Sequence, residues 1–192
     1  ANTLGRRGSK ASVRALAALM NSTESSDVAY AAAAALGKIG GRKAVAALRG
    51  TDYVNNLEFA DAQIVAAREL LKAGKKRAAA RAFKYVLDNS HVDGARWAAF
   101  VGVMTARGVR AVPDIIAALE GDDAVLQSAA NHCVREVGDS KATRAFASRL
   151  PRLAPATQAL VIAALSDRGD TVACPAVLDM LDADDPDRPD LI

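Results

Sequence analysis

Apolar residues recur along the chain with a helical spacing, and glycines interrupt them at regular intervals. Residues 28–48 read VAYAAAAALGKIGGRKAVAAL, an alanine-rich segment that ends at Gly40-Gly41, after which a second apolar segment begins at Ala44. Glycine tolerates the left-handed conformation in which many helices end, so this order predicts a helix, a tight turn and a second helix. We interpret the segment as a helical hairpin.

The same arrangement recurs along the whole chain. Predicted hairpin turns lie near Gly8, Gly40, Gly74, Gly108, Gly138 and Gly169. Successive turns are 32, 34, 34, 30 and 31 residues apart, and an apolar residue stands four positions before each glycine. A period near thirty residues is typical of a solenoid, in which each small unit buries its apolar face against its neighbours.

The second helix of each unit carries two distinct columns. The last aligned position is always large and apolar: Leu16, Leu48, Phe83, Ile115, Phe146 and Val177. The position two residues earlier lies on another side of a helix and should face away from the core. This middle column consists of Arg14, Ala46, Arg81, Pro113, Arg144 and Pro175. The chain is therefore predicted to be all-α, with about five to six helical hairpins.

These units resemble the short, alanine-rich HEAT repeats that are also found in phycobilisome lyases. The resemblance rests on VAYAAAAALGKIGGRKAVAAL and on the second halves RGVRAVPDII and RGDTVACPAVL. It implies a right-handed α-α superhelix of the HEAT-like, armadillo-like kind, whose second helices usually line the concave surface. HEAT solenoids serve many purposes, so the resemblance is specific for the fold and uninformative about the function.

The array is expected to cover residues 1–183. Its first repeat looks truncated, because only the end of a first helix precedes Gly8, and the chain is therefore expected to be part of a larger protein. The third unit begins irregularly between Thr51 and Asp61. Residues 184–192 are acidic and contain proline, which predicts a polar cap or a linker.

The composition argues against catalysis and metal binding but does not identify a partner. The net charge is +3 and only 4% of residues are aromatic. No catalytic motif, metal-binding spacing or cofactor motif is present, so we expect no enzyme activity, no metal and no cofactor. Two cysteines, Cys133 and Cys174, are too few to define a disulfide framework, and their pairing stays open. No apolar run is long enough to cross a membrane, and localisation stays open between the cytoplasm and export.

Charged residues supply the candidate binding sites. Arginine presents a planar fork that suits carboxylate or phosphate, so the second-helix face is expected to bind a partner through Arg14, Arg81, Arg144 and Asp114. A basic edge is expected at the hairpin turns, formed by Arg42, Lys43, Lys75, Lys76, Arg77 and Arg110.

Three hypotheses about the function are consistent with these charged residues. The leading hypothesis is a non-catalytic scaffold that binds another protein or peptide, acidic in character, along the second helices. The alternatives are nucleic-acid binding through the basic edge, and a bilin-lyase-like activity that only the repeat type suggests.

Overall fold

The computed structural model describes residues 12–49 and 54–182, and within these ranges every regular element is a helix. This confirms the all-α prediction. The chain divides into two compact units, Ala1–Ala106 and Arg107–Ile192. A single array over residues 1–183 stays a prediction, and the first turn at Gly8 and the tail at 184–192 lie outside the described residues.

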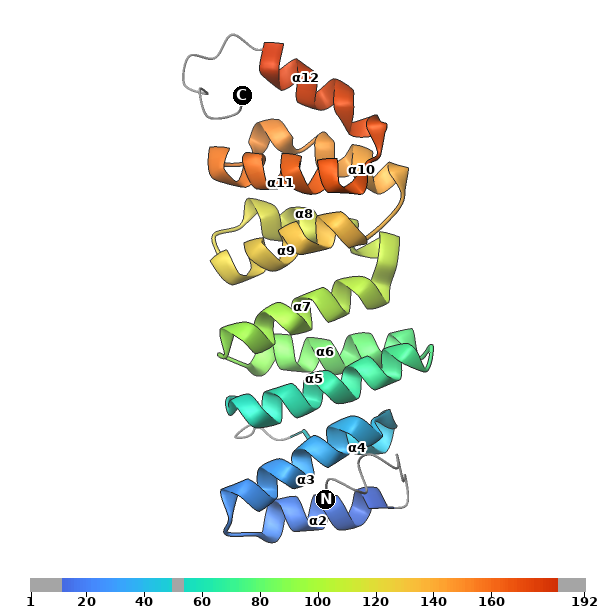
Figure 1. The fold of residues 1–192 in the computed structure, drawn as a ribbon, viewed down its shortest axis with the longest axis vertical. Coiled ribbons are helices and arrows are strands. Elements are labelled where there is room, and N and C mark those ends of the chain that lie inside the picture. Colours follow the sequence, from blue (N-terminus) through green and yellow to red (C-terminus); the bar gives the residue numbers. More distant parts are fainter. Residues whose placement is uncertain (1–11, 50–53, 183–192) are drawn as a thin grey trace. The chain divides into compact units, whose positions relative to one another are not determined.

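The first unit is built from helical hairpins packed side by side (Figure 1). Its helices are α2 (Val13–Ser22), α3 (Ser26–Ile39), α4 (Gly41–Ala47), α5 (Leu57–Lys72), α6 (Lys76–Asn89) and α7 (Asp93–Arg107). Helix α3 packs against α2 and α5, while α5 also contacts α4 and α6. Helices α3 and α5 are thus each covered by neighbours from their own hairpin and from an adjacent one.

The second unit repeats this arrangement. Its elements are η2 (Gly108–Ala111), α8 (Val112–Glu120), α9 (Ala124–Glu136), α10 (Ser140–Ala147), η3 (Leu150–Arg152), α11 (Pro155–Arg168), η4 (Thr171–Ala173) and α12 (Cys174–Asp182). Helix α9 packs between α8 and α11, and α10 contacts both α8 and α11. Short 3₁₀ turns precede α8 and α12, where Pro113 and Pro175 occupy the first helical turn because proline lacks an N–H.

The core follows the predicted columns. Leu16, Leu48, Phe83, Ile115 and Phe146 are each at most 2% exposed, whereas Val177 in α12 is only half-buried.

The alanines are contact residues between closely spaced helices. Ala32, Ala33, Ala66 and Ala67 are fully buried. A Cβ added at Gly37 would lie 2.8 Å from the carbonyl oxygen of Ala62, so α3 and α5 approach closely there. Larger side chains at these positions would separate the helices, which explains why the chain uses its smallest apolar residues.

The turn glycines hold conformations that other residues avoid. Gly40, Gly74, Gly108, Gly138 and Gly169 all have positive φ, and no other residue type in the described ranges does. Gly40 combines φ 61° with ψ −164°, a region that is essentially restricted to glycine. A Cβ there would also collide with the Cβ of Glu69.

We expect Gly40→Ala to lower the free energy of unfolding more than Gly74→Ala does. Both changes strain a backbone with positive φ, at about 1–3 kcal/mol each. Gly74 has open space around its added Cβ, whereas Gly40 meets Glu69, so the Gly40 variant should lose about 1–3 kcal/mol more. Urea denaturation followed by circular dichroism measures both, and equal losses would contradict the close approach of Gly40 to α5.

Candidate functional site: an arginine pocket on the first unit

Formal charge is divided unequally between the two units. Residues 1–106 contain 16 Lys and Arg against 8 Asp and Glu, while residues 107–192 contain 9 against 14. The first unit therefore carries a formal charge of +8 and the second carries −5. A net charge of +3 for the whole chain conceals a strongly basic unit, to which anionic partners are attracted.

The predicted middle column faces solvent. Arg14, Ala46, Arg81, Pro113, Arg144 and Pro175 are all exposed. Arg14 lies on α2 and Arg81 on α6 in the first unit, and Arg144 lies on α10 in the second. Of the three exposed arginines in this column, Arg14 and Arg81 therefore belong to the same compact unit.

Arg81 lines a pocket between α4, α5 and α6. Two further arginines, Arg42 and Arg49, line the same pocket, which has a volume of about 200 Å³. Its apolar lining comes from Val45, Ala46, Leu70 and Ala78, and no acidic residue is among the described residues that line it. Three arginines and four apolar residues thus line the pocket.

Internal contacts hold two of these arginines. The guanidinium of Arg49 lies 5.2 Å from the ring centroid of Tyr85, a cation–π arrangement. Arg81 donates from Nε to the carbonyl oxygen of Arg77, at 3.4 Å. None of the three pocket arginines forms an ion pair with a carboxylate in the described part of the chain.

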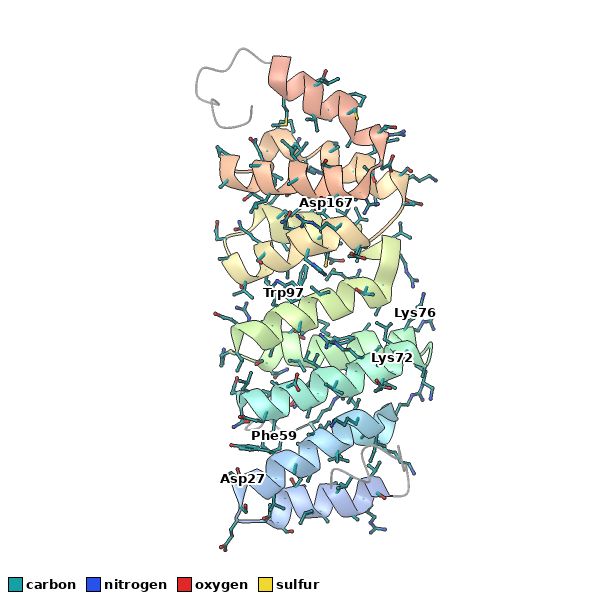
Figure 2. All side chains as sticks on the ribbon, in the orientation of Figure 1. Asp27, Phe59, Lys72, Lys76, Trp97 and Asp167 are labelled. Atoms are coloured by element: carbon teal, nitrogen blue, oxygen red, sulfur yellow. The ribbon has the colours of Figure 1, made fainter. Side chains whose placement is uncertain are left out.

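The predicted basic edge is exposed throughout. In the first unit it comprises Arg42, Lys43, Lys75, Lys76 and Arg77, and in the second it comprises Arg110. Figure 2 shows Lys72 and Lys76 at the turn end of the α5–α6 hairpin. Asp27, in contrast, lies in the first turn of α3, away from the turn at Gly40. Lys72 pairs with Glu69 at 2.7 Å. Arg42 belongs to both the edge and the pocket, so the two surfaces are continuous.

Several charged groups of the second unit have partners within that unit. Asp114, predicted to contact a partner, forms an ion pair with Arg107 at 2.6 Å. Arg135 pairs with Asp167 at 2.7 Å. The pKa of Asp170 lies below its ordinary value. The larger cause is a hydrogen bond with the Ser140 side chain, and a smaller one is the hydrogen bond from the backbone N–H of Val172.

Arg168 ties one hairpin of the second unit to the next. Its guanidinium donates to the carbonyl oxygens of Val134 and Val137, at 2.7 and 3.0 Å, and to the hydroxyl of Thr143 at 3.0 Å. It also reaches the carbonyls of Gly138 and Asp139. These oxygens lie at and beyond the carboxyl end of α9, where backbone acceptors lack helical partners and a cation is favoured. Arg168 is therefore a structural residue.

The glutamines are a feature that the hydrophobic pattern did not reveal. The chain has only three, Gln63, Gln127 and Gln158, and each stands eleven residues before a turn glycine. Each donates its amide to a carbonyl at the end of the preceding second helix or just beyond it, respectively Leu48, Gly121 and Leu150. Their equal spacing from the turns was the sequence signal, and these bonds fix each hairpin against the one before.

The cysteines and histidines form no site. Both cysteines are free thiols, Cys133 buried and Cys174 exposed. Burial, with a smaller effect of Glu136, raises the pKa of Cys133 to about 12, so its thiol stays protonated and unreactive. No cluster of three His, Cys, Asp or Glu side chains in the described ranges could hold a metal ion. Within the same ranges, no helix is both long and apolar enough to cross a bilayer.

Comparison with known families agrees with the hairpin architecture. Residues 1–53 match the family model of HEAT repeats. No curated protein matches the chain. The match covers 53 of the 192 residues and supports HEAT repeats in that part of the chain, while the all-helical architecture is consistent with a HEAT-like α-α solenoid. The match concerns HEAT repeats in general and does not distinguish the phycobilisome-lyase type.

We expect Arg168→Leu to destabilise the protein by about 1–3 kcal/mol, because it leaves carbonyls at the end of α9 without their partners. Arg168→Lys should recover only part of this loss, since an ammonium group cannot reproduce the fork. Arg144→Leu is the matched control on an exposed site of the same unit and should change stability by less than about 0.5 kcal/mol. Urea denaturation compares the three, and equal effects at both arginines would contradict the structural role of Arg168.

Proposed function

We propose that the chain is a non-catalytic interaction scaffold that binds an acidic protein or peptide along the second helices of its first unit. The observation that carries this proposal is the pocket lined by Arg42, Arg49 and Arg81, with no carboxylate among its described lining residues. Arg14 on α2, a helix that contacts α4, extends the same surface.

The physical case rests on charge and preorganisation. A formal charge of +8 on the first unit attracts anions at long range and raises the rate of encounter. At short range, guanidinium groups form bidentate hydrogen bonds with carboxylates. HEAT repeats generally act as protein-interaction scaffolds, which agrees with a surface made of stacked helices.

The second unit is left out of the proposed surface. Asp114 already pairs with Arg107 within the second unit. Arg144 is exposed but lies on the other unit, where acidic residues outnumber basic ones. Whether the second helices form a concave face in common stays a prediction.

Nucleic-acid binding is the competing outcome. The turn cations of the first unit would also attract a phosphate backbone, but the aromatic platforms on which single strands stack are scarce in this chain. Including duplex and single-stranded DNA as competitors separates the two functions in one experiment.

We expect a fluorescein-labelled oligoglutamate peptide to bind the full chain, with an affinity that falls as salt rises towards about 0.15 M. Arg81→Gln should weaken binding about fivefold, at the upper end for one exposed ion pair. Arg14→Gln should have a smaller effect of the same sign. Fluorescence anisotropy measures all of these affinities.

Arg68→Gln is the matched control, because it removes the same charge from an exposed site on α5 that does not line the pocket. Equal weakening by Arg68→Gln and Arg81→Gln would reduce the effect to net charge and would overturn the proposed site. Absence of peptide binding together with tight DNA binding would replace the proposal with the nucleic-acid function.

A further inference from the structure

We propose that the pocket lined by Arg42, Arg49 and Arg81 recognises a phosphorylated side chain of the acidic partner. The inference rests on the proposed function and specifies the chemical group that the pocket binds. No described residue supplies negative charge to the pocket lining, so the ligand has to supply it.

Charge matching favours a phosphoryl group over a carboxylate. Three guanidinium groups carry three positive charges and present many N–H donors. A single carboxylate brings one negative charge and two oxygens. A phosphate monoester brings a charge of about −1.5 to −2 and three strong acceptor oxygens. The phosphoryl group therefore satisfies more of the pocket's donors and leaves less positive charge uncompensated.

The three arginines lie at separate places: on α4, two residues beyond its end, and on α6. Arg42 lies in the first turn of α4, Arg49 lies just beyond its last turn, and Arg81 lies on α6. Groups that approach an anion from different directions suit a tetrahedral phosphoryl group better than a planar carboxylate, which two parallel hydrogen bonds already satisfy.

The surroundings of the arginines reduce the entropy lost on binding. The guanidinium of Arg49 lies over the ring of Tyr85, and Arg81 donates from Nε to the carbonyl oxygen of Arg77 in a long hydrogen bond of 3.4 Å. Leu70, which is 2% exposed, and its apolar neighbours line the pocket, so part of its wall cannot hydrogen-bond to water. A restricted, partly apolar environment strengthens charge-assisted hydrogen bonds relative to those in bulk water.

The pocket also has enough room for such a group. Its volume of about 200 Å³ is more than ten times the roughly 10–15 Å³ that one water molecule needs. It is nevertheless too small for a folded element of a partner, so we infer that one side chain enters it while the rest of the peptide lies along the second helices.

The test uses three fluorescein-labelled acidic peptides that differ at one central position, which is phosphoserine, glutamate or serine. We expect the phosphoserine peptide to bind the full chain about tenfold more tightly than the glutamate peptide. Arg42→Gln, Arg49→Gln and Arg81→Gln should each reduce this ratio towards one. Arg68→Gln should leave the ratio unchanged while lowering all affinities slightly. Circular dichroism checks that each variant is folded.

The outcomes separate this inference from the function on which it rests. Equal binding of the phosphoserine and glutamate peptides, with Arg81→Gln still weakening both, would overturn phosphoryl recognition and leave the acidic-partner scaffold intact. No binding of any peptide would overturn both. A phosphoserine preference that survives in all three pocket variants would show that the phosphoryl group binds elsewhere and would overturn the assignment to this pocket.

Discussion

Mutual burial between hairpins is the constraint on which the rest of the structure depends. A hairpin of two short helices cannot cover its own apolar face, so α3 needs α2 and α5, and α9 needs α8 and α11. Close approach makes this possible, because small residues such as Gly37 and Ala62 allow the backbones of α3 and α5 to come together. The glutamine amides add polar specificity, since each satisfies a carbonyl of the preceding hairpin.

This packing also determines which side chains remain for binding. Burying one column of each second helix leaves the column two residues earlier exposed, which places Arg14 and Arg81 in solvent. The two units then use their charges differently. In the second unit, Arg107, Arg135 and Arg168 have partners within the unit, whereas the first unit keeps its pocket arginines available. The same fold thus accommodates different uses of charge in its two units, and the proposed binding surface lies on the first.

The periodic pattern made the architecture predictable, whereas contacts between neighbouring helices could not be predicted from it. The helix-ending glycines and the large apolar column could be recognised because both depend on short-range rules of backbone conformation and burial. Arg49 was not predicted, because its place near Tyr85 and in the pocket with Arg81 depends on how α4 and α6 each pack against α5. The structural role of Arg168 depends likewise on the neighbouring hairpin. The division of charge between the units was present in the sequence but became meaningful only once their boundary was known.

The most direct test of the binding site is NMR spectroscopy of the arginine Nε–H groups in the full chain during titration with the oligoglutamate peptide. Our account predicts that the signals of Arg42, Arg49 and Arg81 shift together and saturate with one affinity, while those of Arg68 and Arg144 stay in place. Shifts of similar size at all five arginines, or shifts that spare the three pocket residues, would contradict it.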